Sequence, residues 1–168
     1  ASCTSTNFAP KQMGLGTFGM GFVADEPGSE AETLFVANEY GLGKLDTSSL
    51  TISPAGSFGF SAAVELTGTG HGELHGLFLG FPPYIAKLNK QTSALGVESK
   101  LHSVQVGTGF AFAFWGGSFW VFTAPDGLHS KVDRYDPMQD LTETVITTLD
   151  FKIVGAGVST CAPVEPPK

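Results

Sequence analysis

With 168 residues, of which 42% are hydrophobic, the chain has the size of one domain and enough apolar side chains to form its own core. Its net charge of −7, with only nine lysines and arginines, excludes the basic surface that nucleic acids require. Glycine, proline or a charged residue interrupts every apolar stretch before it reaches the roughly 18 residues that span a membrane, so no transmembrane segment is predicted.

The 22 glycines and 14 phenylalanines, with charged residues at only 15%, are typical of short aromatic strands joined by tight turns. We therefore expect an all-β fold with little helix. GLGTFG at residues 14–19 formally matches a dinucleotide-binding motif, but the overlapping segment FGMGFVAD that continues from it is strand-like. The phosphates of a dinucleotide need the N-terminus of a helix at that point, so no cofactor is predicted.

One pattern recurs three times along the chain. LGKLD ends at Asp46, IAKLN ends at Asn89 and VDRYD ends at Asp136, and a leucine follows each of them closely. The pattern predicts a strand, a turn in which the Asp or Asn side chain bonds to nearby backbone, and a second strand. Two further strand-like segments precede each copy. Each unit of about 45 residues thus holds four short strands, which is the size of one blade of a β-propeller.

The three units cover residues 18–59, 60–106 and 107–150 of a single domain that spans 1–168. The first strand of each unit is rich in glycine and alanine, as expected of strands crowded around a central axis. Three blades are too few to close a ring, because propellers typically have at least four. We expect a composite or incomplete fourth blade, built from residues 151–164 and 1–17. The alternative is a homodimer in which two chains complete one larger ring.

The repeats resemble those of kelch-like and WD40-like propellers, in which a strand ending in RYDP or a similar sequence precedes the outer strand. A group of uncharacterised exported bacterial proteins with a GAGVSTCAP-type C-terminal tail is similar in the segments FGMGFVAD, ETLFVAN, ELTGTG, AFAFWGGSFWVFTAP, SKVDRYDP and FKIVGAGVSTCAP. This resemblance extends over most of the chain, from residue 18 to residue 164. It implies a propeller-like fold and export, and it brings no catalytic residues with it.

The two cysteines, Cys3 and Cys161, lie near opposite ends of the chain and outside any metal-binding spacing. Their placement favours a disulfide between the termini, and therefore a protein that is secreted, periplasmic or attached to the cell surface. In an alternative interpretation, Ala-Ser-Cys at residues 1–3 is the end of a lipoprotein signal, and Cys3 carries lipid. A third alternative is two buried thiols.

The segment HGELH places His71, Glu73 and His75 at alternate positions. In a strand, these side chains would share one face and could bind zinc or iron, which suggests a metal-dependent hydrolase or lyase. We favour a glycine-rich hairpin in which the histidines bind no metal, because a bend at Gly72 would spoil the shared face.

The most aromatic stretch, at residues 109–122, is expected to pack mainly between blades. Trp115 is the exception, because it lies beside two glycines at a predicted loop tip, where aromatic side chains contact sugars or peptides. With Tyr84 and Asp126, which also lie in predicted loops, Trp115 forms the candidate ligand-binding set.

No catalytic residues are predicted, because the chain lacks a GxSxG motif and neither cysteine lies in electropositive surroundings. The sequence favours a non-enzymatic binding or scaffolding module that recognises a glycan or an extracellular protein at one loop face. A purely structural role in assembly and the metal-dependent enzyme are the alternatives.

Overall fold

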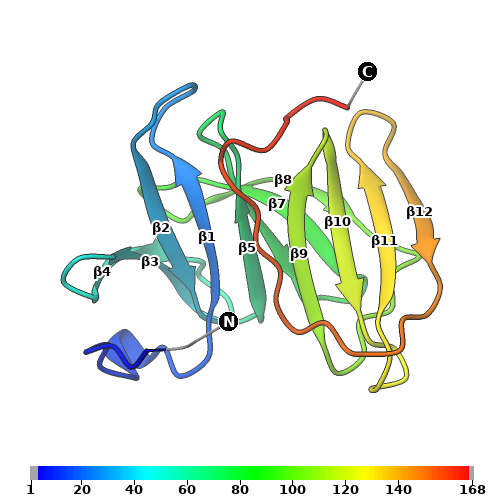
Figure 1. Ribbon diagram of the computed structural model, residues 1–168, viewed down its shortest axis with the longest axis horizontal. Coiled ribbons are helices and arrows are strands. Elements are labelled where there is room, and N and C mark those ends of the chain that lie inside the picture. The colour runs from blue at the N-terminus through cyan, green and yellow to red at the C-terminus, as the bar shows by residue number, and fades with distance from the viewer. Residues whose placement is uncertain (1–3, 167–168) are drawn as a thin grey trace.

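The computed structural model describes residues 4–166, and this part of the chain is all-β, as predicted (Figure 1). Its strands form three separate antiparallel sheets of four strands each. The first sheet contains β1 (Gly19–Ala24), β2 (Glu32–Ala37), β3 (Gly41–Asp46) and β4 (Thr51–Ser57). The second sheet contains β5 (Val64–Gly68), β6 (Leu74–Phe78), β7 (Tyr84–Leu88) and β8 (Leu95–Lys100). The third sheet contains β9 (Phe110–Trp115), β10 (Ser118–Thr123), β11 (Lys131–Asp136) and β12 (Leu141–Ile146).

Within each sheet, the strands lie in chain order, so every strand pairs with its neighbours in the sequence. This order follows from the short connections, because a tight turn can join only antiparallel neighbours. Each sheet lies within one of the three predicted repeat units. The segment FGMGFVAD, which was predicted to be a strand, contains β1.

The turn between the third and fourth strands is built in the same way in all three sheets. In the first sheet, Oδ1 of Asp46 accepts hydrogen bonds from the backbone N–H groups of Ser48 and Ser49, at 2.8 and 2.9 Å. Asn89 and Asp136 accept the equivalent pair of bonds in the second and third sheets. The predicted turn, in which Asp or Asn bonds to nearby backbone, is confirmed in each repeat.

The sheets pack in a row through their apolar faces. Phe35 and Phe78 belong to the core between the first and second sheets, and Leu77, Phe112 and Phe119 belong to the core between the second and third. Full burial of one such side chain contributes about 1.5–3 kcal/mol. Face-to-face burial between sheets is therefore the main force that holds this molecule together.

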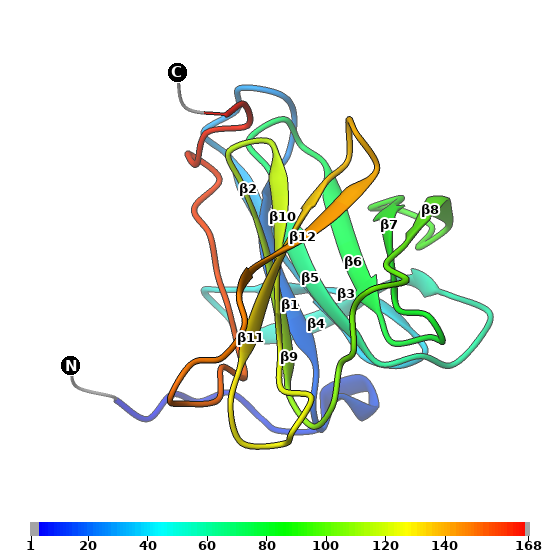
Figure 2. The same cartoon turned by 90° about the vertical axis from the view of Figure 1, so that its right-hand side faces the viewer.

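The first strand of each sheet lies at the centre of the molecule, with β1 beside β5 and β5 beside β9 (Figures 1 and 2). This approach requires small residues. A Cβ atom on Gly19 would collide with the carbonyl oxygen of Val64, and one on Gly21 would lie 3.1 Å from the carbonyl oxygen of Leu66. The prediction that crowding explains the glycines of the first inner strand is confirmed.

Among the described residues, neither 4–17 nor 151–166 contributes a strand, and the predicted composite fourth blade is not formed. The N-terminal segment instead contains the short 3₁₀ helix η1 (Gln12–Gly14). The side chain of Gln12 donates to the carbonyl oxygen of Leu50 and accepts from the N–H of Ile52, at 2.9 and 3.0 Å. These bonds hold the N-terminal segment against β4.

Of the two cysteines near the ends of the chain, only Cys161 lies within the described residues. Cys161 is exposed, and Cys3 lies outside the described residues, so the disulfide between them stays a prediction. Within residues 4–166, no helix has the length and apolar character needed to cross a membrane.

A stability test can detect strain in the repeated turns. Leu50, Ser93 and Asp140 close the three turns with φ angles of 57°, 63° and 50°. A side chain costs about 1 kcal/mol more than glycine in this left-handed conformation. We expect Leu50→Gly to be more stable than Leu50→Ala by roughly 1 kcal/mol in urea denaturation.

The matched control is Leu141 in strand β12, which has no positive φ. At that site the order should reverse, with Leu141→Gly less stable than Leu141→Ala by roughly 0.5–1 kcal/mol. The same order of stability at both positions would contradict turn strain.

Candidate functional site

One face of the first sheet has no sheet packed against it in the part of the chain that the structure describes. This outer face presents Met20 and Phe22 of β1, and Leu34 pairs with Phe22 from β2. The side chains of Met20 and Phe22 are 51% and 38% exposed. By contrast, Phe112 packs between the second and third sheets and is 1% exposed. The first sheet thus carries residues of the core type on a face that is open to solvent.

The third sheet also has an outer face of this kind. Trp115 is 41% exposed at the end of β9, while Trp120 and Phe122 of β10 are half-buried. Trp120 and Phe122 pair with two alanines of β9, which leave room for the large rings. A shallow hollow of about 290 Å³ results, which we call the Trp115 hollow. It is lined by Ala113, Trp115, Trp120, Phe122, Gly157 and Val158.

The C-terminal tail, residues 151–166, runs between these two outer faces (Figure 1, red). At its start, the N–H of Ser130 donates to the carbonyl oxygen of Phe151 at 2.9 Å. Near its end, the N–H of Gly116 donates to the carbonyl oxygen of Pro163 at 2.8 Å. Between these anchors the chain is extended, and alternate side chains are half-buried without forming a sheet ladder.

The figures place the three sheets around this tail. The first sheet extends to one side, the third sheet to the other and the second sheet behind them (Figure 1). In the perpendicular view, the tail and strands β7 and β8 lie at opposite sides of the molecule (Figure 2). We call the region between the outer faces of the first and third sheets, with the tail as its floor, the open sector.

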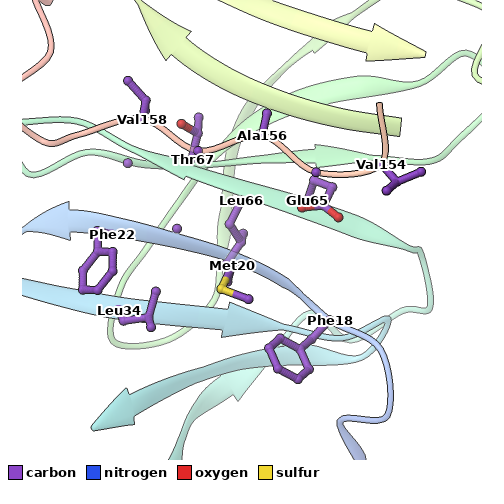
Figure 3. A pocket seen from close by; sticks show the side chains of 14 residues that line it. Phe18, Met20, Phe22, Leu34, Glu65, Leu66, Thr67, Val154, Ala156 and Val158 are labelled. Atoms are coloured by element: carbon purple, nitrogen blue, oxygen red, sulfur yellow. The ribbon is translucent and has the colours of Figure 1, made fainter. Parts of the chain in front are cut away.

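A pocket of about 490 Å³ opens between β1, β5 and the tail, and we call it the Glu65 pocket (Figure 3). Its volume lies within the range of small-molecule sites. The side chains labelled around it are Phe18, Met20, Phe22, Leu34, Glu65, Leu66, Thr67, Val154, Ala156 and Val158. Most of this lining is apolar, and among the lining residues only Glu65 has an ionisable side chain.

Glu65 is half-buried, and burial raises the pKa of its carboxyl group from 4.5 to about 7. Burial is the only cause of this shift. Within residues 4–166, no Lys, Arg or His forms an ion pair with this carboxyl group. The ionised form of Glu65 is therefore partly desolvated and lacks a counterion, which makes the pocket attractive to a cation.

The structure places HGELH at the turn between β5 and β6. His71 is exposed on this turn, and Gly72 bends it with a φ of 74°. Oε1 of Glu73 lies 2.6 Å from Nζ of Lys87, and Oε2 lies 3.7 Å from Nε2 of His75. Among residues 4–166, no three His, Cys, Asp or Glu side chains are close enough to hold a metal ion. Glu73 and His75 are brought together, but they do not form a metal-ligand group with His71.

His75 packs in the core between the second and third sheets. Its ring lies 4.9 Å from that of Phe119 in an edge-on contact and 6.4 Å from that of Phe114 in a stacked one. Burial lowers the pKa of His75 from 6.5 to about 4, although the nearby Glu73 carboxylate opposes this shift. His75 is therefore a neutral core residue at neutral pH.

The predicted ligand set of Trp115, Tyr84 and Asp126 does not lie at one loop face. Trp115 ends β9 at the hairpin to β10, whereas Asp126 follows the other end of β10, roughly 20 Å away along the strand. Asp126 bonds to the backbone N–H of His129 within its own turn, at 2.8 Å. Tyr84 begins β7 and stacks on Phe78 at 5.2 Å. Of the three, only Trp115 faces the open sector.

Comparison of the chain with models of known protein families gives no match, and comparison with curated proteins gives none either.

Glu65 was not predicted as a site residue, because its sequence signal is weak. In VELTG, Glu65 and Thr67 alternate with Val64 and Leu66, which is typical of a strand with one polar, solvent-facing side. This alternation predicts the face on which Glu65 lies. It contains no information that the third sheet packs against that face or that residues 154–158 return beside Glu65.

The buried state of His75 predicts a pH dependence of stability. The folded pKa of about 4 lies below the unfolded value of 6.5, so the unfolded chain binds the proton first as the pH falls. The contribution of His75 to stability should be fully present above pH 6.5 and be lost as the pH falls towards 4, by roughly 3 kcal/mol at most. Glu65, whose folded pKa is raised to about 7, contributes with the opposite sign, so the His75 contribution is measured as the difference between the wild type and a variant.

Urea denaturation between pH 4 and 8 can measure this effect. We expect His75→Phe, which keeps an aromatic ring in the core, to lose this part of the acid dependence. Substitution of the exposed His71 by Gln should preserve it. If His75→Phe lost as much stability as the wild type between pH 6.5 and 4, another group would be responsible for the acid dependence.

Proposed function

We propose that this chain is an exported, non-enzymatic binding module of the β-propeller type, and that it binds an extended segment of an extracellular protein in the open sector. The observation that carries this proposal is the pair of apolar outer faces on either side of the tail. Large exposed apolar surfaces rimmed by polar residues are typical of protein interaction sites.

The propeller assignment is supported by the repeat structure. Three sheets with the same strand order pack face to face, and their first strands lie together at the centre. This is the relation between blades in a propeller, in which each blade buries its faces against the next. The resemblance to kelch-like and WD40-like repeats agrees with the same assignment.

An extended protein segment fits the open sector better than a glycan does. The lining is mainly aliphatic and aromatic, whereas a glycan needs several polar groups to replace its bonds to water. The tail itself is an extended segment that lies across the inner strands without a sheet ladder.

Trp115 is the expected anchor of this interaction. Trp120 donates from Nε1 to the carbonyl oxygen of Trp115 at 3.1 Å, which fixes the backbone at the end of β9. The exposed indole of Trp115 therefore projects from a rigid position. Rigid, partly exposed tryptophans are common among the residues that dominate binding energies.

A random peptide library displayed on phage can test the proposal. Peptides selected on the immobilised chain should bind it saturably. Met20→Ser and Trp115→Ala should each raise the Kd at least tenfold, because they remove apolar contacts from opposite walls of the open sector. Met138→Ser is the matched control, since Met138 is 91% exposed on the β11–β12 turn; it should change the Kd less than twofold.

Circular dichroism must show that all three variants are folded. Selected peptides that are insensitive to Met20→Ser and Trp115→Ala would contradict the proposal, as would binding only to a glycan array. Light scattering tests the homodimer alternative: a mass of twice 17.6 kDa that falls to the monomer value in Trp115→Ala would assign the open sector to a second copy.

A further inference from the structure

We infer that the Glu65 pocket is a binding site for a cation carried on an apolar stem, either a primary alkylammonium or a lysine side chain of the bound partner. The lysine source rests on the proposed function, because it places a protein segment in the open sector. The chemistry of the pocket itself does not depend on that function.

The pocket combines one carboxyl group with an apolar wall. A single carboxyl group lies beside Val154 and Ala156 of the tail, and the aromatic and aliphatic side chains of Met20 and Phe22 form the opposite wall (Figure 3). An alkylammonium matches both parts, because its stem can bury against the wall while its head group reaches the carboxylate. An apolar alcohol matches only the wall, and an alkyl carboxylate would be repelled.

No charged group among the described residues already neutralises Glu65. Strands β1 and β9 contain no ionisable residue, and neither do tail residues 153–158. On β6, the residue opposite Glu65 is Leu77. The neighbouring His75 on the same strand is neutral at pH 7, since burial holds its pKa near 4.

The nearby lysines have other partners. Nζ of Lys87 lies 2.6 Å from Glu73, and Nζ of Lys152, at the start of the tail, donates to the carbonyl oxygen of Gly127 at 3.3 Å. A cation that enters the pocket would therefore meet Glu65 without competition from the chain's own ion pairs.

The partial burial of Glu65 strengthens its attraction for a cation. Partial desolvation weakens the screening of Glu65 by water, so an ion pair formed here is stronger than one on an open surface. At longer range, the net charge of −7 attracts cationic ligands and disfavours anionic ones.

Proton linkage gives the site a characteristic pH profile. Glu65 must be ionised to pair with the cation, and its carboxyl group is half-protonated near pH 7. An alkylammonium stays charged up to about pH 10, like lysine. Its affinity should therefore rise about tenfold per unit between pH 5 and 6 and level off above pH 7.5, whereas the affinity for a neutral alcohol should not change.

Calorimetric titration of the full chain at pH 7.5 with n-hexylammonium, n-hexanol and n-hexanoate tests the inference. We expect saturable 1:1 binding of hexylammonium, at least tenfold tighter than that of hexanol, and the weakest binding for hexanoate. Glu65→Gln should bring hexylammonium to the affinity of hexanol while leaving hexanol binding intact, which shows that the pocket is still formed. Glu98→Gln removes an exposed carboxylate on β8 and should leave all three affinities as in the wild type.

The inference is overturned if hexylammonium does not bind saturably, if it binds no tighter than hexanol, or if Glu65→Gln keeps the preference for the ammonium. These outcomes differ from failure of the proposed function, which concerns peptides and the variants Met20→Ser and Trp115→Ala. The lysine source is tested by replacing each lysine of a selected peptide with norleucine. One such replacement should weaken the binding of the peptide to the wild type but not its binding to Glu65→Gln. Equal weakening in both proteins would show that the pocket binds small amines and not a lysine of the partner.

Discussion

The structure depends on one constraint: a sheet that is apolar on both faces must have both faces covered. The three sheets satisfy this constraint for each other at two interfaces, where Phe35 and Phe78 fill the first core and Phe112 and Phe119 fill the second. A row of three sheets still leaves two end faces without a partner among the described residues. The exposed residues of the first and third sheets follow directly from this number of repeats rather than from any local irregularity.

The tail covers part of the gap, but its composition limits what it can do. It crosses the inner strands as an extended segment in which Gly155 and Gly157 alternate with Val154, Ala156 and Val158. Side chains of this size shield the inner strands without filling the space between the outer faces. The Glu65 pocket of about 490 Å³ therefore remains on the side of the tail that faces the first sheet, and the Trp115 hollow remains on the side that faces the third sheet. The same partial cover desolvates Glu65, which links the unusual carboxyl group to the open faces of the first and third sheets.

The features that could be predicted from the sequence are those set by short-range patterns. Asp46, Asn89 and Asp136 marked the repeated turns because an Asx turn depends on a few consecutive residues, and the glycines of β1 indicated close packing because nothing larger fits there. The path of the tail could not be predicted, since it is fixed by contacts between segments that lie far apart in the sequence. The N-terminal segment contacts β4 through Gln12, whose side chain bonds to residues 38 and 40 positions further along the chain, and no local pattern encodes this contact. For the same reason, Trp115 was recognised but Glu65 was not: an exposed hairpin tip can be predicted locally, whereas a pocket assembled from three segments cannot.

Glu65 and His75 illustrate why burial alone does not identify a functional group. Thr67 pairs with His75 across β5 and β6, so Glu65, two residues before Thr67, lies on the same face of the second sheet as the histidine. Burial shifts both groups towards their neutral forms, which are both present between about pH 4 and 7. His75 is enclosed between two phenylalanine rings, so ionisation there can only weaken the core. Glu65 borders a pocket into which water or a ligand can enter, so the charge it acquires above pH 7 can be compensated from outside the protein. The difference in access, not the size of the pKa shift, makes Glu65 the group suited to recognition.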